Sequence, residues 1–255
     1  MKHLSLVRAC LGGAVFAAVV AMPELAEAQP SIDISIGGDS EGPEQVVGTL
    51  KILGLLTILA VAPAILISMT SFTRIVVVLS FVRQAIGTQN VPPMQVILAL
   101  SLLLTAVVMT PVAKEIDEQA FSPYVAETID EEMMFTRSHD IIRTFLIGQT
   151  READLRQFFD MTSTPLPQSE ADVPLTLLVP AFLISELRTG FEMGFLLFLP
   201  FVLIDLIVAA ILTAMGMVML PPTMVSTPMK LLLFVVVDGW ALLTQSLVAS
   251  FSGSA

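Results

Sequence analysis

The residues from 179 to 251 contain two long apolar segments joined by a proline-rich turn at 221–228, and this stretch limits the possible folds most strongly. The segments, 193–220 and 231–251, are long enough to cross a hydrocarbon core, because about 20 helical residues suffice at about 1.5 Å each. Each segment also carries one carboxylate, Asp205 or Asp238. A charge at the bilayer centre costs about 2.5 kcal/mol or more on insertion scales. We therefore expect a helical hairpin that packs against other protein or water rather than standing alone in lipid.

The composition is that of a membrane protein. Of the 255 residues, 55% are hydrophobic and 14% are charged, whereas soluble domains carry about 25% charged residues. The mean hydropathy is +0.85. The net charge of −11 argues against nucleic acid as a partner, since such partners require basic patches. We predict an all-α fold of integral membrane-type helical hairpins.

The first 28 residues have the pattern of a secretory signal peptide. Two basic residues precede a short apolar run at 9–21, and Ala26 and Ala28 form an A-x-A cleavage pattern. An uncleaved transmembrane helix is the alternative, which the short run and its interruption by Pro23 and Glu24 disfavour. The single cysteine lies within these residues, so the predicted mature chain has no disulfide.

The remaining chain divides into four predicted regions. Residues 29–49 form a flexible, polar, extracytoplasmic lead, and residues 50–113 form a first hairpin with apolar segments at 52–73 and 94–113. The connection between these segments carries two arginines, Arg74 and Arg83, and no acidic residue, which predicts a cytoplasmic location. Its apolar centre, residues 75–82, predicts a helix that packs against the assembly. Residues 175–255 form the C-terminal hairpin.

Residues 114–174 differ from the rest in charge. The stretch 114–172 holds 13 acidic and 5 basic residues, and its apolar residues recur at helical spacing. We predict a small amphipathic helical subdomain followed by a proline-containing linker. The signal peptide and the charge distribution place this subdomain outside the cytoplasm.

The sequence shows no pattern typical of an enzyme. His139 is the only histidine after residue 28, and one histidine without cysteine ligands does not form a metal site. Asp205 and Asp238 lack the flanking Gly-x-Gly-Asp arrangement of an intramembrane aspartyl protease. No glycine-rich phosphate loop or serine nucleophile with a histidine partner is recognisable. We predict no catalytic residue, no metal and no cofactor.

Two groups of residues in the C-terminal hairpin are candidates for packing or pairing. The first group comprises three charges, Glu186, Arg188 and Glu192, in the stretch PAFLISELRTGFEMGF. Glu186 and Gly190 lie on one helical face with Gly194 one turn further, and small residues there allow another backbone to approach closely. The alternative is a helix end with snorkelling charges. Asp205 and Lys230 are the only charges between residues 193 and 237. They pair within a subunit, pair between subunits, or each face water.

A methionine cluster lies at the end of the first apolar segment. Met215, Met217 and Met219 adjoin a glycine and a Pro-Pro pair, where helix becomes loop. Methionines at helical spacing commonly fill cores. Flexible thioethers at a constriction can also close it to water and ions and deform around varied cargo.

Several ordered motifs together resemble the FliP family of flagellar type III export gate proteins, related to the SctR/YscR proteins of injectisomes. They are PAFLISELRTGFEMGF, LPFVLID, MGMVMLPP and VVVDGW, preceded by SMTSFTRIVVVLSFVRQAIGTQNVPP. The resemblance extends over essentially all of the chain after residue 28. The signal peptide and the Val-Asp-Gly-Trp segment are similar to the flagellar branch.

The resemblance implies a subunit of a pentamer-like ring that binds FliQ and FliR, works with FlhA and FlhB at the basal-body ring, and conducts unfolded proteins across the bacterial inner membrane. It implies a pore-lining loop at Met217, Val218 and Met219, with Met215 nearby. Val218 departs from the three consecutive methionines of some members. Glu186, Asp205 and Lys230 are implied as charges for assembly or gating, and Asp238 is a further candidate. The alternatives are an ion- or proton-coupled transporter that uses Asp205 and Asp238, and an injectisome gate subunit.

Overall fold

The computed structural model describes residues 43–87, 91–167, 169–217 and 219–252, and every regular element in these ranges is a helix. The chain forms two units, residues 1–54 and 55–255, and the packing described below belongs to the second. The elements are α2 (Pro43–Ser68), α3 (Phe72–Ile86), α4 (Met94–Ile116), the π-helical turn η1 (Asp117–Phe121), α5 (Ser122–Val125), α6 (Glu131–Gln149), α7 (Glu152–Met161), the 3-10 turn η2 (Glu170–Asp172), α8 (Leu175–Ala214), α9 (Thr223–Val236) and α10 (Gly239–Ser252). The predicted all-α class is confirmed for the described residues.

Among the residues that the structure describes, two stretches are long and apolar enough to cross a membrane. They are Met94–Val125, which joins α4, η1 and α5, and Leu175–Ala214, which is α8. A third span is available if α9 and α10, which meet at 63°, count as one broken span. The predicted segment 94–113 therefore lies in a membrane-length helix. The predicted segment 52–73 does not form one, because α2 ends at Ser68 and α3 begins at Phe72, and its apolar stretch Ile52–Ile65 falls short of membrane length.

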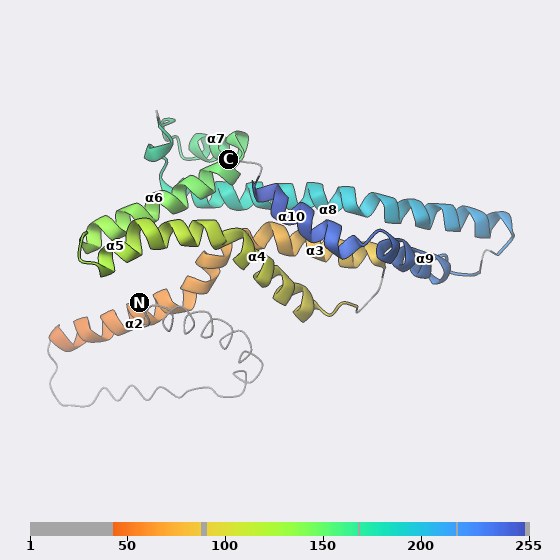
Figure 1. Cartoon of the computed structure of the whole chain (residues 1–255), viewed down its shortest axis with the longest axis horizontal. Helices are drawn as coiled ribbons and strands as arrows, with labels where there is room; N and C mark the ends of the chain where they lie inside the picture. Colours follow the sequence, from red (N-terminus) through yellow and green to blue (C-terminus); the bar gives the residue numbers. More distant parts are fainter. Residues whose placement is uncertain (1–42, 88–90, 168, 218, 253–255) are drawn as a thin grey trace. The chain divides into compact units, whose positions relative to one another are not determined.

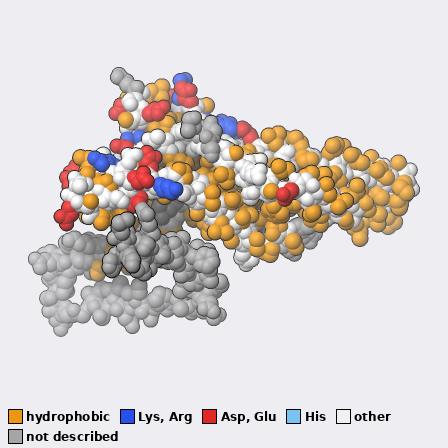
Figure 2. All heavy atoms as spheres, viewed as in Figure 1, with side chains coloured by type: hydrophobic (Ala, Val, Ile, Leu, Met, Phe, Trp, Pro, Cys, Tyr) orange, Lys and Arg blue, Asp and Glu red, His pale blue; other side chains and the backbone are white. Residues whose placement is uncertain are grey.

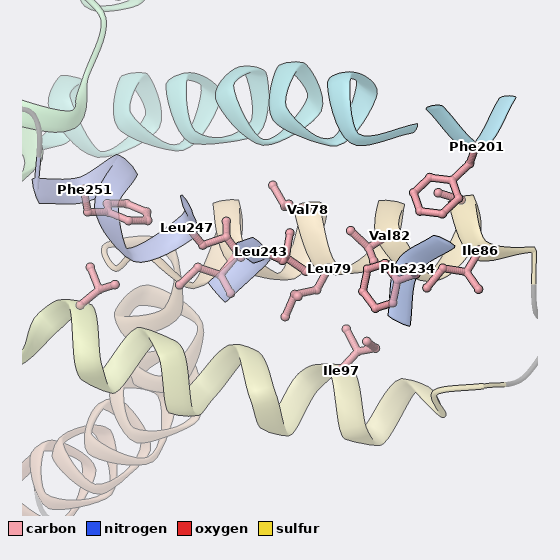
Figure 3. Packing of buried hydrophobic residues seen from close by; sticks show 13 residues of the cluster. Val78, Leu79, Val82, Ile86, Ile97, Phe201, Phe234, Leu243, Leu247 and Phe251 are labelled. Atoms are coloured by element: carbon pink, nitrogen blue, oxygen red, sulfur yellow. The ribbon is translucent and has the colours of Figure 1, made fainter. Parts of the chain in front are cut away.

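α3 is the central helix of the second unit. It packs against α4 and α8 (Figure 1). The side chains of Ile75, Val78 and Leu79 are fully buried, and Figure 3 shows the last two. Figure 3 shows residues of α4, α8, α9 and α10 that point toward the same core, among them Ile97, Phe201 and Leu247. The expected helix at 75–82 is thus confirmed, and it is the core of the unit.

A second apolar cluster joins the acidic region to the first half of α8. Leu146 of α6, Phe159 of α7 and Phe182 of α8 pack together, and each is at most 1% exposed. The Asp130 side chain begins α6 by accepting a hydrogen bond from the Met133 amide at 2.8 Å, a typical N-cap. Charged side chains gather over this end of the unit, whereas apolar side chains cover the second half of α8 (Figure 2).

The C-terminal hairpin differs from the sequence-based prediction at two points. The turn lies between Met215 and Pro222, and Pro228 of the expected proline-rich turn is inside α9. The second apolar segment, 231–251, is interrupted at Asp238, whose φ of 51° lies in the left-handed region. A helix cannot continue through that conformation, so one expected segment is two short helices.

Candidate functional site

A buried arginine joins four helices of the second unit. Arg74 of α3 is 4% exposed and forms a bidentate ion pair with Glu186 of α8, which is fully buried; the Arg74 Nε to Glu186 Oε2 distance is 3.0 Å. Its Nη2 also donates to the Oε1 atom of Gln149, the last residue of α6, at 3.1 Å. Its Nη1 donates to Ser250 of α10, at 3.3 Å to the backbone oxygen and 3.2 Å to Oγ. We call these residues, together with Phe251, the Arg74 centre.

The Arg74 centre explains how a carboxylate resides in the apolar α8. An unpaired buried charge is strongly destabilising, and breaking a buried pair by removing one partner costs about 3–5 kcal/mol. Glu186 was among the predicted residues, whereas Arg74 was interpreted only as a marker of topology. The signal that could have identified it is an arginine followed directly by the apolar run of residues 75–79.

The face of α8 that carries Gly190 and Gly194 packs against α3 of the same chain. A Cβ atom placed on Gly190 would lie 3.2 Å from Val77, and one placed on Gly194 would lie 2.6 Å from the Phe81 ring. The glycines of α8 therefore allow α3 to pack closely, as the spacing predicted. The backbone that approaches them is intramolecular.

Asp205 and Lys230 form the second internal ion pair. Lys230 Nζ lies 2.5 Å from Asp205 Oδ2, and Ser226 Oγ donates to Asp205 Oδ1 at 2.6 Å. The pair links α8 to α9, with the lysine side chain 7% exposed and the aspartate 40% exposed. Of the arrangements left open by the sequence, the fold shows pairing within one chain.

The methionine turn, residues 215–222, begins with a helix-ending motif. The Met217 amide donates to the Leu212 carbonyl and the Gly216 amide to the Thr213 carbonyl, each at 3.0 Å, with Gly216 at φ 75°. This is the Schellman arrangement. Met219 is 98% exposed, Met215 is 65% exposed and Met217 is 39% exposed. Val218 lies outside the described residues.

Asp238 lies apart from the Arg74–Glu186 and Asp205–Lys230 pairs. It is exposed and provides the left-handed residue between α9 and α10. Phe234 and Trp240 stack edge to face across this break, with ring centroids 5.2 Å apart. The four predicted charges therefore serve three separate places in the fold: the Arg74 centre, the α8–α9 pair and the α9–α10 elbow.

A polar network fixes α7 to α8. Asp154 is 1% exposed and accepts from Ser185 Oγ at 2.8 Å and from Arg188 Nη1 at 2.9 Å. Arg151 donates to Glu192 at 2.6 and 3.0 Å, and this bond raises the pKa of the guanidinium above its ordinary value. Arg188 and Glu192 were singled out from the sequence, but their partners Asp154 and Arg151 were missed, because these are ordinary charged residues until α7 folds back on α8.

The described residues include no group of three or more histidine, cysteine, aspartate or glutamate side chains that could hold a metal ion. His139 lies in α6 beside Arg143, whose Nη2 is 3.0 Å from the ring Nδ1. The predicted cleavage residues Ala26 and Ala28 lie outside the described residues. The arrangement offers packing, ion pairing and a methionine-bearing turn.

Comparison with known proteins gives consistent matches over most of the chain. A sequence model of the FliP family matches residues 55–247. The flagellar biosynthetic protein FliP of Bacillus subtilis (strain 168) is 49% identical over 212 residues, which are 83% of this chain and 96% of that protein. The proteins of the same name from Cereibacter sphaeroides and Aquifex aeolicus (strain VF5) are 46% and 44% identical over 224 residues each. These alignments cover 88% and 87% of this chain, and 73% and 92% of those proteins.

Proposed function

The chain belongs to the FliP family, and on this premise we propose that it is a core subunit of the flagellar type III protein export gate, without catalytic chemistry of its own. The relatives described above carry flagellar names. They support the flagellar reading over the injectisome and transporter alternatives.

The observation that carries the proposal is the apolar surface of α8 and α9. Side chains with at least 60% of their area exposed include Phe195, Leu196, Leu206, Leu232, Val235 and Val236. An exposed apolar surface of this extent requires lipid or other protein. From residue 193 to the end of α9 the chain carries only two charges, Asp205 and Lys230, and they pair with each other, so the exposed apolar surface of this part has no unpaired charge that would oppose assembly.

In the proposed assembly, several copies form a pentamer-like ring together with FliQ and FliR, in contact with FlhA, FlhB and the basal-body ring. The ring lies in the bacterial inner membrane with the acidic subdomain, residues 114–174, on the periplasmic side. Unfolded flagellar proteins pass through its centre. The gathering of charged side chains away from the apolar half of α8 supports placing this subdomain outside the lipid (Figure 2).

The first test is native mass spectrometry of the chain, co-expressed with its genomic neighbours and extracted in mild detergent. We expect a ring of several copies that retains smaller membrane partners. A monomer or dimer without partners would contradict the proposal, and proton-flux measurements on variants of Asp205 and Asp238 would then test the transporter alternative.

The methionine turn is proposed as the seal of the closed pore. Met219 supports this role because its side chain is almost fully exposed at a turn between two apolar helices. Replacing Met217 and Met219 with Ala removes flexible thioethers from the constriction. We expect greater ion conductance through the assembled complex reconstituted in bilayers. An assembled variant without added conductance would exclude the seal.

A further inference from the structure

The segment from Glu186 to Ser250 begins and ends at the same guanidinium group. Glu186 of α8 contacts Arg74, and Ser250, near the end of α10, contacts it again. Between these two residues lie the rest of α8, the methionine turn, α9 and most of α10. We infer that Arg74 is a clasp that closes this segment into a loop and holds the last turn of α10 in place. The clasp comprises the five residues of the Arg74 centre.

The clasp is built for arginine in particular. A guanidinium has five N–H donors, and the contacts supply an acceptor for each: two Glu186 oxygens, one Gln149 oxygen and two Ser250 oxygens. The Phe251 ring covers the guanidinium face, 3.9 Å from Cζ to the ring centroid. A lysine has three donors and no planar face. It therefore cannot reproduce this arrangement.

The clasp also completes the C-terminus of α10. The last four carbonyls of a helix have no partner within it, and basic side chains at that end satisfy them and interact favourably with the helix dipole. Here the Ser250 oxygen accepts from Arg74, and the Phe251 oxygen accepts from Gln149 Nε2 at 3.3 Å. α10 is thus capped by side chains of α3 and α6.

This capping ties α10 to the acidic region. Gln149 ends α6, so one side of the clasp belongs to the α6–α7 subdomain and the other to the hairpin that carries the methionine turn. The consequence for export rests on the proposed function: release of α10 would loosen α9 and α10, which follow the methionine turn in the proposed gate. The clasp itself is a property of the single chain.

Hydrogen–deuterium exchange with mass spectrometry on the full chain in detergent tests the clasp. Phe251→Leu retains apolar bulk and removes the aromatic ring. Arg74→Lys retains the positive charge and removes the planar guanidinium with its five N–H donors. We expect amides in the last two turns of α10 to exchange about tenfold faster in each variant, since buried charge-assisted hydrogen bonds and cation–π contacts are lost. The separate variant Phe251→Tyr retains an aromatic face, so its α10 amides should exchange as slowly as in the wild-type chain.

The matched control is Arg156→Gln, which removes an exposed ion pair with Glu152 four residues away in the sequence. It should leave exchange in α10 unchanged. Unchanged exchange in both Phe251→Leu and Arg74→Lys would overturn the inference, as would a uniform rise across all helices in Phe251→Leu. Because the measurement requires neither a ring nor export, it stands or fails separately from the proposed function.

Discussion

At the scale of single residues, two glycines of α8 decide how closely α3 can pack. The space beside Gly194 is filled by Phe81, which also stacks edge to face on Phe191 with centroids 5.4 Å apart. A glycine inside a helix costs about 1 kcal/mol relative to alanine. The close contact between α3 and α8 offsets this cost, since it permits the deep burial of α3.

Gly194→Ala is expected to lower the free energy of unfolding by about 1–3 kcal/mol, because the new methyl group overlaps the Phe81 ring. Chemical denaturation in detergent measures the change. Adding Phe81→Leu to the same chain should recover part of the loss. Gly54→Ala, where no atom lies within 4 Å, is the matched control. Equal stability of Gly194→Ala and wild type would contradict the packing argument.

Gly216 differs from Gly194, because its space is empty and only its backbone conformation requires glycine. No atom lies within 4 Å of a Cβ placed there, and φ is 75°. The left-handed conformation costs roughly 1–2 kcal/mol for most residues, and Asn tolerates it best. We therefore expect Gly216→Asn to retain stability and Gly216→Val to lose roughly 1–2 kcal/mol in the same denaturation experiment. Equal losses would refute the backbone explanation.

At the scale of elements, the break between α9 and α10 is fixed by two neighbouring residues. Asp238 adopts the left-handed conformation, and a Cβ atom on Gly239 would lie 2.3 Å from the Phe234 ring. The ring of Phe234 also packs on Trp240. The elbow is therefore held by side-chain packing on both sides of Asp238.

The elbow can be tested by fluorescence, because Trp240 is the only tryptophan in the chain. Asp238→Gly should leave the Trp240 emission spectrum unchanged, since glycine adopts positive φ without strain. Gly239→Ala should shift the emission, because the methyl group displaces Phe234 from the indole ring. Identical spectra for the two variants would show that the packing does not define the elbow.

At the scale of the whole second unit, the α6–α7 region is joined to α8 by an apolar cluster and by the network around Asp154. The cluster gives non-directional attraction, whereas the carboxylate requires Ser185 and Arg188 in defined places. The network therefore sets where along α8 the helix α7 docks.

Asp154→Ala is expected to destabilise this docking by about 1–3 kcal/mol, because the buried Ser185 hydroxyl loses its acceptor. Limited trypsin digestion should then cleave faster after Arg156, the arginine within α7. Asp160→Ala is the control, since Asp160 is an exposed carboxylate of the same helix. Unchanged cleavage in Asp154→Ala would show that the apolar cluster alone positions α7.

Local sequence features correctly predicted the parts of the structure that depend on residues close together in the chain. The apolar segments predicted helices, the helical spacing of 114–172 predicted an amphipathic region, and the glycines of α8 predicted a close backbone contact. The run at 75–82 predicted a packed helix. Each of these signals rests on residues within a few turns of one another, where helical periodicity relates sequence to a face.

Only the tertiary structure decided which distant groups meet. Arg74 and Glu186 are 112 positions apart, and nothing in either sequence neighbourhood specifies the other, so the arginine was interpreted as a topology marker. The break at Asp238 was missed because a straight helix and a bent helix have the same apolar sequence pattern. Buried charges are stabilised by partners that folding brings to them. Hence the sequence determined that Glu186 and Asp205 need partners, and the packing of α3 and α9 on α8 decided that those partners are Arg74 and Lys230.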